Sequence, residues 1–414
     1  MTTHDPVRTA IEIREQISSE KRKLAFFFGA GTSMAIGLPG IADLTTRVSD
    51  LLEEPFEKQF KDLKERLAKS ANVENILDRL RTIRDLVGDG EQGEYDGLKG
   101  SEAVKKLDLA VCKIICDIMC GIPENEMTPH LIFAHWIRSL YSNRYSPIEI
   151  FTTNYDLILE KAMEQLGVPY FDGFIGSVAP FFAPESVDAE EGRANQSAYP
   201  PRMWTRLWKL HGSINWLLCN IGGKKRLTRL SGHQPKAGDE LMVFPSRDKY
   251  SESRKLPFIT FQDRFRRFLF GGEALLIICG YSFSDEHINE IIFQGLRSNP
   301  RLSIIALIFG EKNENSDGPQ LIVPNQIIQY AEEHRNFSVL GPDKASIGGL
   351  VGKWVPSRKR KDDEDWPFWD DALTMFTLGD FNRFASYLEI FIGGLRDVSR
   401  TSQPTASHSE EAQT

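Results

Sequence analysis

The sequence predicts an α/β domain built on a parallel β-sheet. Five short apolar runs are too short for helices and unbroken enough for strands that are buried on both faces. Long stretches with helical patterns separate the runs, and strands that alternate with helices are typical of a parallel sheet. The runs cover residues 24–28, 148–152, 207–210, 275–279 and 304–309.

The composition fits a folded chain. With 414 residues, 41% of them hydrophobic and 26% charged, there is ample material for a core, so collagen-like, disulfide-scaffold and wholly disordered proteins are excluded. No apolar run approaches the ~18 residues of a membrane helix, and no signal peptide is visible. Five cysteines without a CxxC pair predict a reducing, cytoplasmic location and no metal site. The net charge of −8 argues against direct nucleic-acid binding by the bulk surface.

The strand pattern predicts one main domain over residues 1–310. A mostly helical stretch at about 50–147 is expected to be an insertion, and residues 172–202, rich in Ala, Pro, Ser and Gly, are expected to form a loop or lid. Residues 311–400 are expected to pack on the domain as a helical C-terminal extension, and the polar tail 401–414 to be disordered. The stripe that predicts a packing helix in the extension consists of Phe381, Phe384, Leu388 and Phe391.

A glycine-rich segment directly follows the first predicted strand. Glycines there would let the backbone approach a pyrophosphate, and the N–H groups of the next helix could bind its charge. The strict GxGxxG pattern fails because Met34 stands at its third glycine, and a tight strand-to-helix turn explains this motif about equally well. The candidate cofactor-binding residues are Gly29, Ala30, Gly31, Thr32, Ser33, Gly37 and Pro39.

Polar residues also follow the second and third predicted strands. Asn154 and Asp156 come just after residue 152, where they could orient a ribose and a water, although taken alone Asp156 is better explained as a helix cap. His211 closes the third strand, and its ordinary pKa of ~6.5 suits proton transfer, although a lone histidine is more often structural. Because all three motifs stand at strand ends, we expect one shared pocket.

The fourth strand runs into GYSFSD. Gly280, Tyr281 and Ser282 could hold a second part of a dinucleotide, while Ser284 or Asp285 could cap the next helix. These two interpretations are compatible.

In this order and spacing, GAGTSMAIGLP, TTNYD, KLHGS and GYSFSDEHIN resemble the sirtuin-like NAD-consuming fold, in particular its bacterial anti-phage defence branch. The resemblance spans about residues 26–309 and implies a Rossmann-like domain that binds NAD+ and breaks the bond between nicotinamide and ribose. It implies that Asn154 and Asp156 lie near the nicotinamide ribose, that His211 is the catalytic histidine, and that Gly280 and Ser282 face the adenosine half. The phosphates would be surrounded by Gly29, Ala30, Gly31 and Ser33.

The chain departs from protein-deacylating sirtuins in two ways. It lacks their two zinc-binding CxxC pairs, and the Phe–Arg pair that usually follows the glycine–proline turn is missing after Pro39. An acyl-lysine groove is therefore not expected, and water becomes the most available nucleophile. The expected activity is that of a metal-independent NAD+ glycohydrolase, in which Asn154 holds the ribose and the water, His211 accepts a proton and Asp156 sets the local geometry. The alternative is a non-catalytic module that senses NAD+ or ADP-ribose.

The resemblance also implies a role and partners. The defence branch depletes NAD+ in abortive infection and is commonly found with a HerA-like hexameric ATPase or a prokaryotic Argonaute. Since the chain has no GxxxxGK[ST] loop, any ATPase must be a separate polypeptide. A homo-oligomer is expected, and no membrane partner.

Overall fold

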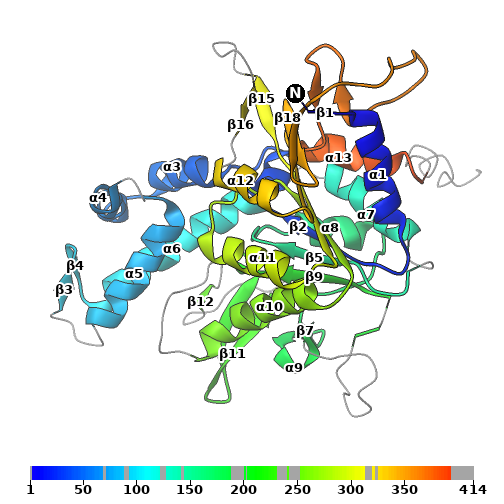
Figure 1. Cartoon of the computed structure of the whole chain (residues 1–414). Coiled ribbons are helices and arrows are strands. Elements are labelled where there is room, and N and C mark those ends of the chain that lie inside the picture. The colour runs from blue at the N-terminus through cyan, green and yellow to red at the C-terminus, as the bar shows by residue number, and fades with distance from the viewer. Residues whose placement is uncertain are drawn as a thin grey trace, which may run out of the picture.

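The computed structural model shows a long sheet with helices on both faces and a lobe of helices at one side (Figure 1). In the part of the chain that it describes, every helix is too short or too polar to cross a lipid bilayer. The described residues are 2–68, 71–87, 93–121, 127–140, 144–187, 200–201, 203–230, 240–241, 252–312, 319–321 and 325–392.

All five predicted strands lie in the main sheet, next to one another and parallel. Their apolar side chains are buried on both faces, which is why the runs are unbroken. The predicted fold class, a parallel sheet flanked by helices, is confirmed. In spatial order the strands are β6 (Tyr170–Phe171), β9 (Thr205–Lys209), β5 (Glu149–Thr152), β2 (Lys23–Phe28), β13 (Ala274–Cys279) and β14 (Leu302–Leu307).

The strand order reverses at β2. From β2 the chain continues to β5 and β9 on one side, and later to β13 and β14 on the other. Phe28, the last residue of β2, pairs with Thr152 of β5 and Cys279 of β13. Ligands of open α/β sheets bind off the carboxyl ends of the strands at such a reversal. The segments after β2, β5 and β13 therefore meet where a ligand is expected.

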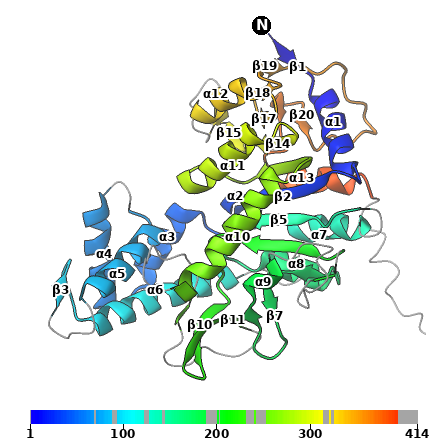
Figure 2. The same ribbon diagram turned by 60° about the horizontal axis from the view of Figure 1, so that its bottom comes forward.

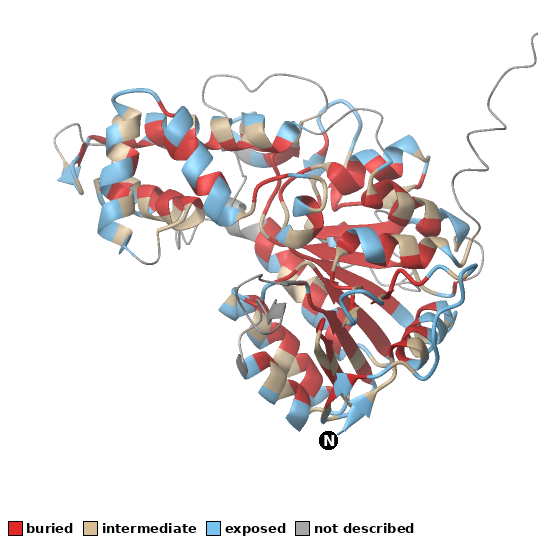
Figure 3. Cartoon of the chain, turned by 90° about the horizontal axis from the view of Figure 1, so that it is seen from above, coloured by how far each residue is buried: buried red, intermediate tan, exposed pale blue. Residues whose placement is uncertain are grey.

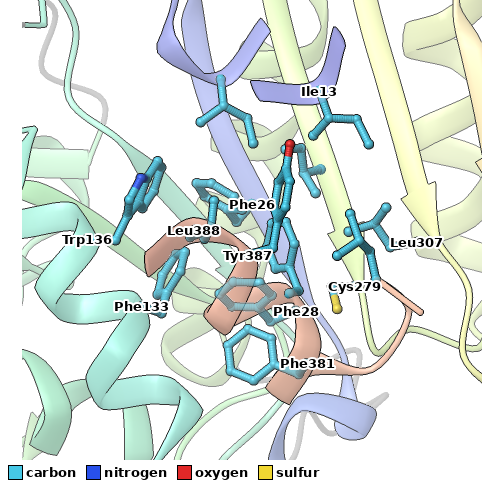
Figure 4. Close-up of a cluster of buried hydrophobic side chains, with 14 of the residues drawn as sticks. Ile13, Phe26, Phe28, Phe133, Trp136, Cys279, Leu307, Phe381, Tyr387 and Leu388 are labelled. Carbon is cyan, nitrogen blue, oxygen red and sulfur yellow. The ribbon is translucent and has the colours of Figure 1, made fainter. Parts of the chain in front are cut away.

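Four helices cover one face of the sheet. Phe28 packs there against Phe133 and Phe381, with ring centroids 5.1 Å from each (Figure 4). The Tyr387 hydroxyl donates to the carbonyl of Ala10, so the first of these helices is joined directly to the last. The four helices are α1 (Pro6–Ser18), α7 (Pro129–Ser139), α8 (Ile158–Gln165) and α13 (Phe381–Glu389).

Three helices cover the other face. Phe27 points to this side and packs against Phe265. The buried Glu149 of β5 also lies on this face, where it accepts from the partly exposed Arg264 at 2.6 Å and from the Trp208 indole at 2.8 Å. The helices are α10 (Glu252–Phe270), α11 (Glu286–Ser298) and α12 (Asn325–Glu333).

The predicted helical insertion forms the lobe, which has a core of its own (Figures 2 and 3). Tyr155, Ile158 and Ile214 of the main domain enter that core, so the lobe packs directly on the segments that follow β5 and β9. The last helix of the stretch, α7, lies on the sheet instead. The lobe contains α3 (Ile41–Leu51), α4 (Phe56–Leu67), α5 (Val73–Val87), α6 (Ser101–Cys120) and the hairpin β3 (Glu94–Tyr95) with β4 (Leu98–Lys99).

The stretch expected to be a loop or lid, residues 172–202, contains three short elements and belongs to a second sheet of five strands. Residues 188–199 and 202 lie outside the described part of the chain. The elements of this region are β7 (Phe174–Ile175), β8 (Phe181–Phe182), α9 (Pro184–Val187), β10 (Trp216–Ile221), β11 (Lys224–Arg229) and β12 (Glu240–Leu241).

The C-terminal extension contributes strands to the main sheet in addition to the predicted helix. In α13, Phe381, Phe384 and Leu388 of the predicted stripe are buried, while Phe391, just beyond the helix, is half-buried. The tail 401–414 lies outside the described residues. The remaining strands are β17 (Phe337–Leu340), β18 (Lys344–Ile347), β19 (Leu350–Trp354) and β1 (Thr3–His4) in the main sheet, with the pairs β15 (Gly310–Lys312) and β16 (Pro319–Leu321), and β20 (Trp369–Asp370) and β21 (Met375–Phe376).

Candidate functional site

The loops after β2 and β13 pack directly on each other. Gly31 N donates to the Gly280 carbonyl at 2.8 Å, at the start of the five-residue helix α2 (Ala30–Met34). A Cβ on Gly29 would lie 2.5 Å from the Gly280 oxygen, and one on Gly280, whose φ is +68°, would lie 2.5 Å from the Thr32 nitrogen. The glycines are therefore required by the contact between the two loops. Whether this loop pair also holds a pyrophosphate stays a prediction.

Asn154 joins the end of β5 to the loop after β2. Its Nδ2 lies 3.1 Å from the Gly29 carbonyl, 3.0 Å from Thr32 Oγ1 and 2.8 Å from Ser33 Oγ. Thr32 donates its own hydroxyl hydrogen to the Gly29 carbonyl, and Ser33 donates to Asp156, so all three atoms can only accept from Asn154. This determines the orientation of the amide, and Oδ1 is the atom that these contacts leave for other partners.

The Asp156 carboxylate connects the segment after β2 to the start of α8. Its Oδ2 accepts from Ser33 Oγ at 2.6 Å and its Oδ1 accepts from the backbone of Ile158 at 3.0 Å, at the start of α8. The residue is 5% exposed. Asp156 is not the N-cap residue that the sequence predicted, since Leu157 holds that position of α8 and makes no side-chain cap hydrogen bond. The Asp156 carboxylate instead reaches Asn154 through Ser33.

His211 follows the end of β9 just as Asn154 follows the end of β5. Thr152 pairs with Lys209 across the two strands, and each site residue follows its strand end by two residues. His211 Nε2 lies 2.9 Å from Asp285 Oδ2, and the two side chains are 14% and 23% exposed. The neighbouring parallel strands thus bring the predicted amide and imidazole to the same edge of the sheet.

Asp285 both caps α11 and contacts His211. Its Oδ1 accepts from the backbone of His287 and Ile288, which confirms the predicted cap. Burial would raise the pKa of Asp285, but the hydrogen bond and the charge of His211, together with the two backbone donors, outweigh burial and lower this pKa. The carboxylate is therefore held ionised beside the imidazole.

Glu74 of α5 brings a further carboxyl from the helical lobe to the site. Its pKa is raised chiefly by burial; the charge of His211 acts against this, and that of Asp285 adds to it. Sequence reasoning missed Glu74, because it stands in an ordinary amphipathic helix, and no local pattern reveals that this helix packs beside the segments that follow β5 and β9.

The other predicted residues divide into surface and interior positions. Tyr281 turns away from the loop pair into the sheet core, where its ring lies 4.8 Å from Phe27 and its hydroxyl donates to Asn289. Only its backbone can face a ligand at the loop pair. Ala30, Gly37 and Ser282 are exposed, whereas Thr32, Ser33 and Pro39 are buried. In the described part of the chain, no three or more His, Cys, Asp or Glu side chains gather as a metal site would require.

A model of the SIR2-like domain matches residues 148–330. The match covers less than half of the chain, including Asn154, His211 and Gly280 but not the loop after β2. No curated protein matches the chain.

Several solved structures are similar over most of their length. They are a Sir2 homologue mutant in complex with 2'-O-acetyl ADP ribose (15% identity, 71% of this chain and 83% of the other, TM-score 0.33), a Sir2 homologue–NAD complex (14%, 73%, 82%, 0.36) and Sir2 bound to an acetylated peptide (14%, 72%, 86%, 0.32). All three TM-scores are below 0.5.

Proposed function

We propose that this protein is a sirtuin-like NAD+ hydrolase that cleaves the nicotinamide–ribose bond and releases nicotinamide and ADP-ribose. The observation that carries the proposal is the matched placement of Asn154 and His211 at the ends of adjacent strands, beside the loop pair at the strand-order reversal. The match of the SIR2-like domain to residues 148–330 supports it.

Departure of nicotinamide needs no general acid, because the nicotinamide ring of NAD+ already carries a positive charge. The site has to stabilise an oxocarbenium-like ribose and direct a water to it. Asn154 Oδ1 can accept a hydrogen bond from a ribose hydroxyl or from the water, since Nδ2 is held by the loop after β2. His211, whose Nε2 lies 2.9 Å from Asp285 Oδ2, is the group that accepts a proton from the water. One water is consumed, and one proton leaves with the products.

The test is nicotinamide release from NAD+ by purified wild type, Asn154→Ala and His211→Ala. We expect each substitution to lower kcat by about 10²-fold or more, the size of effect of a lost general base or transition-state contact. His287→Ala, which removes an exposed histidine close to Asp285, is the matched control and should keep wild-type turnover. A folded Asn154→Ala or His211→Ala variant with full activity contradicts the role given to that residue.

The alternative is a module that senses NAD+ or ADP-ribose without turnover. Calorimetric titration of wild type with NAD+, followed by chromatography of the same sample, separates the two functions. Binding with intact NAD+ after long incubation favours the sensor and contradicts the hydrolase.

We further propose, on the resemblance of the four sequence motifs, that hydrolysis serves anti-phage defence by NAD+ depletion, in an oligomer that works with a separate HerA-like ATPase or an Argonaute. Cellular NAD+ should then fall after phage infection in cells that express wild type with its partner, and remain constant with His211→Ala. Equal NAD+ levels in the two strains contradict this role.

A further inference from the structure

Lys209, the last residue of β9, has its ammonium group buried close to the site. Its side chain is 3% exposed. Nζ donates to three acceptors: the backbone carbonyl of Asp156, Glu160 Oε1 at 2.7 Å and Ser213 Oγ at 3.1 Å. An ammonium has three hydrogens, so these contacts satisfy it completely.

The three acceptors belong to the two segments that carry the proposed catalytic groups. Asp156 and Glu160 follow Asn154 along the chain, and Ser213 follows His211. A backbone hydrogen bond of 2.9 Å from Ile214 to the Tyr155 carbonyl runs between the same segments. Lys209 therefore ties the loop after β5 to the loop after β9.

A buried ion pair is a costly way to make this connection. Burial raises the pKa of Glu160, and the charge and hydrogen bond of Lys209 act against that rise. Apolar side chains of similar volume often replace buried ion pairs with no loss of stability, so stability alone is a weak reason for the pair. Its geometric effect is to set the separation of two loops.

We propose that Lys209 is a positioning residue that holds the Asn154 loop and the His211 loop at the separation needed for reaction. The inference rests on the proposed hydrolase function. It implies that loss of the ammonium leaves the loop pair after β2 and β13, and hence NAD+ binding, largely intact, while the alignment of amide and imidazole is lost. Misplacement of reacting groups by about 1 Å can cost about 10²-fold in rate.

The chain supplies a matched control. Glu149 of β5 is buried and forms another ion pair, with the partly exposed Arg264 of α10, on the opposite face of the sheet. Arg264→Met should lower stability as the loss of a buried charge partner does, and leave the two site loops in place. Lys209→Met removes the charge and keeps the aliphatic length of the side chain.

The experiment compares wild type, Lys209→Met, Lys209→Met/Glu160→Gln and Arg264→Met by nicotinamide release, by NAD+ calorimetry and by thermal unfolding. The double variant removes both charges together, so no unpaired carboxylate stays buried if the single variant folds poorly. We expect both Lys209 variants to lose 10- to 100-fold in kcat, with the NAD+ Kd within threefold of wild type. Arg264→Met should keep wild-type kcat even if its Tm falls as far as that of the Lys209 variants.

A folded Lys209 variant with wild-type kcat overturns the inference, as does an Arg264→Met variant that loses as much kcat as the Lys209 variants. A wild type that releases no nicotinamide contradicts the proposed function instead. In that case the ¹⁵N NMR resonances of the His211 ring, assigned with His211→Gln, test the positioning role without activity. Lys209→Met should shift these resonances and Arg264→Met should not; unchanged resonances in Lys209→Met overturn the inference.

Discussion

His211 Nε2 and Asp285 Oδ2 lie 2.9 Å apart and connect the end of β9 to the start of α11. The two residues belong to different motifs of the sequence, and the sheet brings them together from opposite sides of β2. The backbone N–H groups at the start of α11 hold Asp285 through its other oxygen, so the imidazole is oriented by a carboxylate that cannot easily rotate. This relationship gives the first prediction.

Asp285→Asn should lower kcat by about 10- to 100-fold while the protein stays folded. Asparagine caps a helix about as well as aspartate, so the cost in stability should be only a few tenths of a kcal/mol. What is lost is the negative charge that stabilises a protonated His211. Turnover and thermal unfolding are measured together, with Asp5→Asn, at the cap of α1, as the matched control. Equal turnover in the two variants would contradict the role of Asp285.

Ser33→Ala should lower both stability and turnover. Ser33 donates to the buried Asp156 and accepts from Asn154, so its removal leaves the carboxylate with one partner fewer and the amide less constrained. We expect a loss of about 1–3 kcal/mol in the free energy of unfolding and of about tenfold in kcat. Ser186→Ala, which removes another buried serine hydroxyl, should leave kcat unchanged. A Ser33→Ala variant as active as Ser186→Ala would show that turnover does not need the hydrogen bonds of Ser33 to Asp156 and Asn154.

Gly280→Ala should separate the effect of close packing from that of backbone conformation. Gly97→Ala provides the comparison, because Gly97 also has a positive φ, +79°, but a Cβ there meets nothing within 4 Å. The cost at Gly97 should be about 1–2 kcal/mol for the left-handed conformation. At Gly280 the collision with Thr32 N adds about 1–3 kcal/mol more. Urea unfolding measures both; equal costs would mean that the two loops can move apart freely.

His130 should make the protein less stable as the pH falls from about 6.5 to 4. It is 1% exposed on α7, and burial lowers its pKa to about 4, although the charge of Asp156 acts in the other direction. In that pH range the unfolded chain binds a proton that the folded protein excludes, which removes about 3 kcal/mol by pH 4. His130→Phe should reduce this dependence by about 2 kcal/mol between pH 7 and 5, as measured by urea unfolding.

The exposed His287 supplies the control for this prediction, since His287→Gln should keep the wild-type dependence on pH. If the free energy of unfolding falls equally with pH in wild type and His130→Phe, the pH dependence does not come from His130.

The parallel strands were predictable because burial on both faces leaves unbroken apolar runs in the sequence. Asn154 and His211 were predictable for a related reason, since polar residues at strand ends stand out from such runs. Strands β17–β19 were not predicted, because buried and partly exposed residues mix in them and no unbroken apolar run marks them, unlike the equally short β5 and β9. In a short strand of mixed burial, the alternation of apolar and polar residues is too weak to predict the strand.

The support of the site was not predictable. Lys209 stands in an apolar run as any strand lysine might, and its burial depends on acceptors from α8 and from two loops. The position of Glu74 depends on how the helical lobe packs, through Tyr155 and Ile214, on the main domain. These contacts join residues far apart in the chain, and no local pattern encodes such distances.

The hydrogen bond from Tyr387 to Ala10, and the packing of Phe381 on Phe28, have a consequence for biosynthesis. While the chain emerges from the ribosome, Phe133 of α7 can cover Phe28 on this side of β2, but Phe381 of α13 follows much later in the sequence. The cover of β2 is therefore incomplete until α13 has been translated, and a nascent chain exposes part of this apolar face until α13 docks.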